Sequence, residues 1–127
     1  MPRAKLRKRK SVPCTSLRDE LREFVRERDW AQFHDPKNLV MALVSEAGEL
    51  AAELRWVRSD AADAACKEPE LRARVADEVA DVGICLVLLA ERLGLDLGAE
   101  MKRKIAKNRE KYPADVSRGR ALPPREP

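Results

Sequence analysis

The chain of 127 residues is 44% hydrophobic and 38% charged, with a formal net charge of +4, which suits one domain that buries its own core. No apolar run approaches the roughly 18 residues of a membrane span, so we expect no membrane association. Three scattered cysteines, Cys14, Cys66 and Cys85, argue against a disulfide framework or a zinc cluster, and we expect a cytoplasmic protein.

The chain begins with a basic segment, residues 1–15, which contains six lysine and arginine residues and no acid. We expect a solvated, disordered tail, with contact to nucleic acid or an anionic partner as the alternative. Between this tail and residues 114–127, acidic residues outnumber basic ones. A nucleic-acid-binding surface over the whole domain is therefore not expected.

The first two helices are predicted from their start signals. Ser16, followed three residues later by Asp19, forms a capping-box pattern that opens a helix over about residues 17–31. An Asp-Pro pair then starts a second helix over about residues 36–58. The acid can cap this helix, and proline suits its first turn.

A polar connector, residues 59–69, precedes two further predicted helices. The third spans about residues 69–92, and its second half is apolar almost all round. It should therefore be buried on more than one side, which a subunit interface would explain. The fourth helix spans about residues 97–111, with Asp96 as its cap and Pro113 after its end.

Together these elements predict an all-α fold, because four helices joined by short connections form a four-helix bundle. The folded domain would span residues 16–113. A flexible C-terminal tail, residues 114–127, would follow it.

Two acid pairs lie at matching places on the second and third predicted helices. Glu46 and Glu49 lie in or beside the apolar stripe of the second helix, and a shift of 32 positions leads to Glu78 and Asp81 on the third. If the two helices pack antiparallel through these stripes, the four carboxylates converge. Like charges at close range raise one another's pKa, and a hard divalent cation, magnesium or manganese, relieves the conflict. The alternative is that each pair lies on a solvated edge beside arginine, as a single such pair usually does.

The fourth predicted helix carries Lys104, Asn108 and Lys111 on one face, because they follow one another at steps of four and three residues. Beside a cluster of carboxylates and metal, these groups could share the negative charge of a polyphosphate. Taken alone, the pattern also fits an ordinary solvated amphipathic helix.

Four aromatic or imidazole side chains offer flat surfaces for a nucleobase; they are Trp30, Phe33, His34 and Trp56. Aromatic residues at helix ends also serve as core plugs, and their spacing does not separate the two roles. His34 is the only histidine, so a zinc role is not expected. Neither acid pair has the Glu-x-x-His spacing of ferritin-type di-iron centres, which favours magnesium over iron.

Several segments resemble the MazG-like all-α nucleoside triphosphate pyrophosphatases, and most closely the dCTP pyrophosphatases in that family. The resemblance covers about residues 16–113. Its most specific part is a Trp-x-x-Phe-His block joined to the two acid pairs. The segments that carry it are residues 28–39, 46–50, 77–82 and 108–113, together with Lys104.

The resemblance implies a magnesium-dependent hydrolase that converts dCTP, or a modified dCTP, to dCMP and pyrophosphate. It also implies a homotetramer, a dimer of dimers, with its sites near the subunit interface. By matching position, the metal ligands would be Glu46, Glu49, Glu78 and Asp81, with Glu46 or Glu49 as the group that activates water. The phosphate ligands would be Lys104, Asn108, Arg109 and Lys111, and the residues around the base would be Trp30, His34, Asn38 and Trp56.

Two positions depart from the dCTP pyrophosphatase pattern. Cys85 stands where a tyrosine is usual, and Leu21 stands where a histidine is frequent. Both lie on the base side of the family's pocket, so the preferred base stays open. A different class of function is also open, namely a non-catalytic helical module whose acids are structural and whose basic tail binds nucleic acid or a partner.

Overall fold

The structure, a computed structural model, describes residues 14–121, and every regular element in that range is a helix. The predicted all-α class is confirmed. The long helices are α1 (Cys14–Glu27), α2 (Pro36–Leu54), α4 (Pro69–Arg92) and α5 (Leu97–Lys111). The short ones are η1 (Ala31–Phe33), η2 (Ser59–Ala61), α3 (Ala62–Ala65) and α6 (Ala114–Ser117).

The predicted tails lie partly outside the described residues. Of the basic tail, residues 1–13 lie outside, and α1 already begins at Cys14. Residues 122–127 of the C-terminal tail also lie outside, while α6 occupies part of the segment that we expected to be flexible. Among residues 14–121, no helix has both the length and the apolar character that crossing a membrane requires.

The first helix ends four residues earlier than the sequence predicts. Asp29 has a φ of 52°, a left-handed conformation that side chains other than glycine, asparagine and aspartate rarely adopt. The N–H groups of Arg28 and Trp30 donate back to the carbonyl oxygen of Val25, at 3.3 and 3.1 Å. This turn closes α1 at Glu27 and sends the chain into η1.

The predicted caps of the later helices are confirmed. The Asn38 N–H donates to Asp35 Oδ1 at 2.9 Å at the start of α2, and the Ala99 N–H donates to Asp96 Oδ1 at 3.0 Å at the start of α5. Each bond satisfies an N–H group that has no partner within its own helix. The second predicted helix, however, ends at Leu54 rather than near residue 58.

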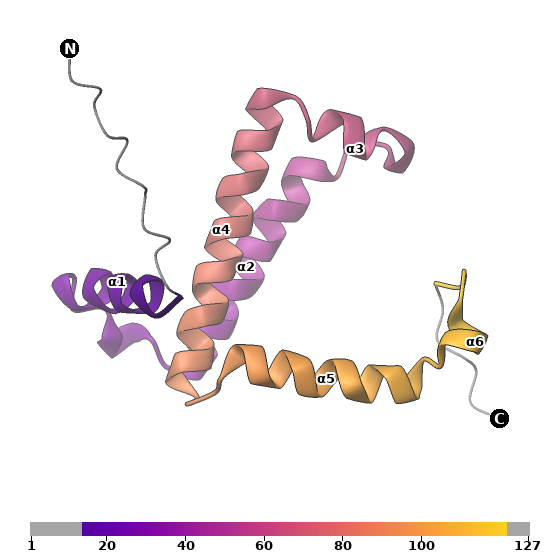
Figure 1. Cartoon of the computed structure of the whole chain (residues 1–127). Coiled ribbons are helices and arrows are strands. Elements are labelled where there is room, and N and C mark those ends of the chain that lie inside the picture. The colour runs from indigo at the N-terminus through magenta and orange to yellow at the C-terminus, as the bar shows by residue number, and fades with distance from the viewer. Residues whose placement is uncertain (1–13, 122–127) are drawn as a thin grey trace, which may run out of the picture.

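α2 and α4 pack antiparallel along each other, and this hairpin is the main contact between long helices (Figure 1). α1 lies beside the second half of α4, whereas α5 leaves the end of α4 and projects away from the hairpin (Figure 1). A single chain therefore does not close the predicted four-helix bundle. The apolar pattern of a helix shows that it is buried, but it does not show which chain buries it.

The described part of the chain has a very small core. Its buried apolar residues are Val25, Leu39 and Ala90, while large apolar side chains on α2, α4 and α5 stay exposed, among them Val44, Val79 and Ile105. So many exposed large apolar side chains on three helices are typical of surfaces that another molecule covers.

Candidate metal centre

The antiparallel hairpin brings three of the four predicted metal ligands together. Glu46 and Glu49 on α2 and Glu78 on α4 each offer one carboxylate oxygen, and these oxygens lie within 4.8 Å of one another. Glu46 and Glu78 are half-buried, and Glu49 is exposed. Asp81 lies outside this group, although its charge acts on both Glu46 and Glu78.

The cluster holds excess negative charge. Partial burial, followed by the charges of Glu49 and Asp81, raises the pKa of Glu46. The same three causes, in the same order, raise the pKa of Glu78. The Oε2 atom of Glu78 is buried and has no hydrogen-bond partner, which is costly for a carboxylate oxygen.

These observations fit a divalent cation. The donor set consists of oxygen only, as magnesium and manganese prefer, and the partnerless Glu78 oxygen would gain a ligand bond. The alternative of surface acids paired with arginine does not hold in the described part of the chain, where no ion pair involves Glu46, Glu49, Glu78 or Asp81.

The raised pKa values predict how the stability of the metal-free protein depends on pH. Folding favours the protonated forms of Glu46 and Glu78, so their contribution to stability is fully present below the ordinary carboxyl value of 4.5. It is lost as the pH rises through their raised pKa values. We therefore expect the melting temperature in EDTA to fall, relative to an E46Q/E78Q variant, as the pH rises above about 4.5. Parallel pH profiles for the two proteins would contradict this coupling, and magnesium should restore stability in the wild type only.

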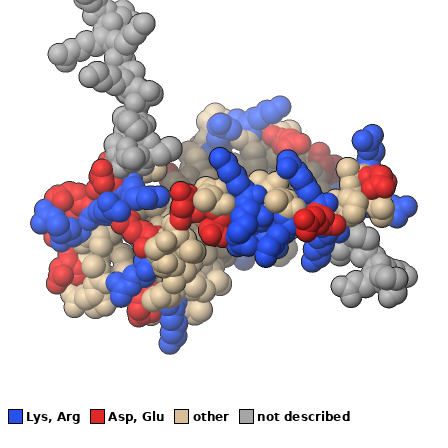
Figure 2. Space-filling model, turned by 60° about the horizontal axis from the view of Figure 1, so that its bottom comes forward, with Lys and Arg blue, Asp and Glu red and all other residues tan. Residues whose placement is uncertain are grey.

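The predicted phosphate ligands do not lie beside these acids within one chain. Lys104, Asn108, Arg109 and Lys111 all belong to α5, which projects away from the hairpin (Figure 1). No hydrogen bond or ion pair between side chains joins α5 to α2 or α4 in residues 14–121. Figure 2 shows lysine and arginine side chains gathered over the face of the molecule that α5 occupies.

The two tryptophans also lie apart. Trp30 lies between α1 and η1, where its ring meets Phe24 edge-on with centroids 5.7 Å apart. Trp56 follows the other end of α2, a 19-residue helix that is about 28 Å long. Trp30 is 44% exposed and Trp56 is 85% exposed, so neither is a core plug in a single chain. One chain cannot place both rings around one base.

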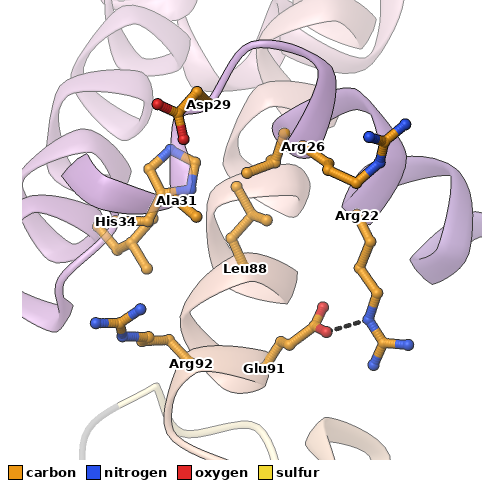
Figure 3. Close-up of a pocket in the computed structure, with 10 residues that line it drawn as sticks. Arg22, Arg26, Asp29, Ala31, His34, Leu88, Glu91 and Arg92 are labelled. Carbon is orange, nitrogen blue, oxygen red and sulfur yellow. Dashed lines mark hydrogen bonds and ion pairs between the residues drawn. The ribbon is translucent and has the colours of Figure 1, made fainter.

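His34 lines a pocket of about 450 Å³ between α1, the segment after it and the end of α4. Figure 3 shows His34 with Asp29 and Arg92 on one side of this pocket, while Arg22 faces Glu91 in an ion pair on the other. Glu91 lies thirteen residues after Glu78, about 20 Å along α4. The pocket is therefore separate from the acid cluster.

Asn38 has a local structural role in this chain. Its side-chain amide donates to the carbonyl oxygen of Phe33 at 3.0 Å, and its backbone N–H completes the cap of α2. These bonds fix the connection between η1 and α2, which holds His34.

A sequence model of the MazG-like family matches residues 41–121, the stretch that contains the hairpin, its four acids and α5. The chain belongs to the MazG-like family. This confirms the resemblance found in the sequence.

Individual relatives and a solved structure agree with this family. The chain is 44% identical over 99 residues to dCTP pyrophosphatase 1 of Rattus norvegicus, covering 78% of this chain and 58% of the relative. It is 44% identical over 96 residues to dCTP pyrophosphatase 1 of Homo sapiens, covering 76% and 56%. The chain thus spans somewhat more than half the length of these relatives. A crystal structure of a pyrophosphatase from Archaeoglobus fulgidus DSM 4304 is similar with a TM-score of 0.75 and 33% identity, covering 85% of this chain and 99% of that one.

Two features of this MazG-like chain escaped the sequence analysis. The first is an ion pair between Glu53 on α2 and Arg74 on α4. Its signal was present, because Glu53 follows Glu49 by four residues and Arg74 precedes Glu78 by four. The second is an apolar groove between α1 and α4, which Leu21 lines together with Phe24 and Ile84. Cys85 on α4 is half-buried and does not line this groove, and partial burial, followed by the charges of Glu46 and Asp81, raises the pKa of its thiol.

Proposed function

We propose that this protein is a magnesium- or manganese-dependent nucleoside triphosphate pyrophosphohydrolase that converts dCTP, or a modified dCTP, to dCMP and pyrophosphate in the cytoplasm. Such an activity would remove unwanted nucleotides from the pool. The observation that carries the proposal is the group of three carboxylate oxygens within 4.8 Å on α2 and α4. The dCTP pyrophosphatases and the archaeal pyrophosphatase that the chain resembles support it.

Glu46, Glu49, Glu78 and Asp81 would hold the metal, which would neutralise the phosphates and lower the pKa of a bound water. The chain itself places half-buried and exposed carboxylates side by side. Either Glu46, which is half-buried, or Glu49, which is exposed, would act as the general base and accept a proton from that water.

A homo-oligomer, with two pairs of chains in a tetramer, would complete the site. On α5, Met101 and Ile105 are exposed and share one side of the helix with Lys104 and Asn108, because all four fall within about 100° around its axis. When this side docks on another copy, the apolar side chains are buried and the polar ones face that copy's hairpin. Because Trp30 and Trp56 lie at opposite ends of α2, we propose that each base site also takes one tryptophan from each of two chains.

The experiment that tests this function is pyrophosphate release from each of the four dNTPs and from modified dCTPs. We expect activity with magnesium, none with EDTA, and a preference among the bases. The alternative, a non-catalytic module that binds through the basic tail, predicts no pyrophosphate with any nucleotide. It also predicts that deleting residues 1–13 abolishes binding to an anionic partner.

The role of the tryptophans can be tested by alanine substitution. Trp30→Ala or Trp56→Ala should remove about 1–3 kcal/mol of base stacking, which raises the Michaelis constant roughly five- to hundredfold and leaves turnover nearly unchanged. Stacking serves substrate and transition state alike. Michaelis constants for four dNTPs, measured beside melting temperatures, check this expectation.

Val116→Ala is the control, since Val116 is an exposed apolar residue on α6, outside the proposed base site. It should change neither quantity much. A Trp variant that loses stability with no change in base preference would show that the ring packs against the protein instead of the base.

A further inference from the structure

The ion pair between Glu53 and Arg74 crosses the hairpin directly beside the acid cluster. Arg74 Nε donates to Glu53 Oε2 at 2.8 Å. The Glu53 side chain is 23% exposed and the Arg74 side chain 55%. Because Glu53 follows Glu49 by one helical turn and Arg74 precedes Glu78 by one turn, the pair lies one turn from the metal-binding residues on both helices.

From this geometry we infer that Arg74 is a positioning residue, which holds a fifth carboxylate, Glu53, away from the metal. The inference rests on the proposed function, since it requires that the cluster binds a cation. Glu53 is close enough for its charge to contribute to the raised pKa of Glu78. Without a partner, its carboxylate would lie on the same face as Glu49, within reach of the same ion.

A fifth carboxylate would change the metal site in two ways. Hard divalent cations accept further oxygen ligands, and each added negative ligand strengthens binding. A ligand from the protein would also occupy a position that water or a phosphate oxygen needs during the reaction. By holding Glu53 in an ion pair, Arg74 keeps that position open.

Titration of the full-length chain with Mn²⁺ tests the inference without substrate. We expect Arg74→Gln to tighten Mn²⁺ binding roughly three- to tenfold, the size expected for one unit charge removed from near a divalent ion. Glu53→Gln should weaken binding because it leaves Arg74 without a partner. The double variant should return to the wild-type value.

Water-proton relaxation of the bound Mn²⁺ separates coordination by Glu53 from a simple change of charge. It counts the water molecules on the ion, and we expect one fewer in Arg74→Gln than in the wild type or the double variant. Turnover of Arg74→Gln should fall with little change in the Michaelis constant. The coordination position that Glu53 would then occupy is needed for the reaction more than for binding the substrate.

Arg22→Gln is the matched control. Arg22 pairs with Glu91 across α1 and α4, with side chains 55% and 27% exposed, but this pair lies about 20 Å along α4 from Glu78. The Arg22→Gln variant should lose an ion pair of the same kind and leave Mn²⁺ binding unchanged. Arg74→Lys keeps the charge and should bind Mn²⁺ like the wild type. Its Mn²⁺ affinity and water count provide a second test if Arg74→Gln folds poorly.

The outcomes distinguish a failure of the role of Arg74 from a failure of the proposed metal-dependent function. Absence of Mn²⁺ binding by the wild type would overturn the metal site and the role of Arg74 together. Binding by the wild type, with the same affinity and water count in Arg74→Gln, would leave the metal site standing and overturn the role of Arg74. An equal change in Arg22→Gln would also overturn it, because the effect would then not depend on the neighbouring cluster.

Discussion

Glu49→Gln is expected to lower magnesium affinity and turnover by at least about tenfold each. The substitution keeps the size of the side chain but removes one negative charge from the cluster, whose three carboxylate oxygens lie within 4.8 Å of one another. Glu46 and Glu78 then lose the neighbour whose charge contributes most to their raised pKa values. Isothermal titration with magnesium and pyrophosphate release at limiting magnesium measure the two losses.

The control for this variant is Asp77→Asn, which removes an exposed acid next to Glu78 in sequence but about 100° around the helix from it. It should change neither affinity nor turnover much. Without metal, Glu49→Gln should melt at the same temperature as the wild type or higher, since repulsion among the acids is relieved. Full activity of Glu49→Gln at limiting magnesium would rule out the four-acid site.

Ile105→Asp is expected to dissociate the oligomer and to lower turnover by at least about a hundredfold, the loss that misplaced catalytic groups commonly cause. Ile105 is exposed on α5, and we propose that it is buried against another copy. A carboxylate there would be desolvated without a partner. Light scattering after size-exclusion chromatography and pyrophosphate release on the same sample check both effects.

Ala106→Asp introduces the same acid one residue further along α5, outside the side that carries Met101 and Ile105. It should leave assembly and turnover close to wild type. An Ile105→Asp protein that stays assembled and active would show that this side of α5 neither forms the subunit contact nor brings the phosphate ligands to the acids.

The sequence predicts the hairpin and its acids well because both follow from local rules. Apolar periodicity gives α2 and α4, and the starts are marked by Asp35 with Pro36 and by Pro69. The two acid pairs occupy matching places on their helices, so their carboxylates meet once the helices run antiparallel. In an antiparallel pair, the step of four residues forward from Glu49 to Glu53 matches the step of four residues back from Glu78 to Arg74, so the ion pair of Glu53 and Arg74 keeps the same antiparallel register. It could have been found from the sequence with the same comparison.

The remaining differences come from information that local patterns lack. The left-handed turn at Asp29 depends on backbone hydrogen bonds to Val25 and Arg26. An aspartate in the sequence is not enough to predict this turn. The short connection before Asp96 does not specify the angle at which α5 leaves α4. A bundle within one chain was therefore the simplest expectation, whereas the apolar sides of these helices remain exposed in the structure.

If the proposed oligomer forms, so small a core would join folding and association in one equilibrium. With Val25, Leu39 and Ala90 as the buried apolar residues of the described range, a lone chain has little to offset the entropy of ordering its backbone. Each copy would then gain most of its stability from its neighbours, and that gain grows with concentration. Dilution would favour unfolded chains, which proteases remove. Cells that make little of this protein would therefore hold even less of it than synthesis alone predicts.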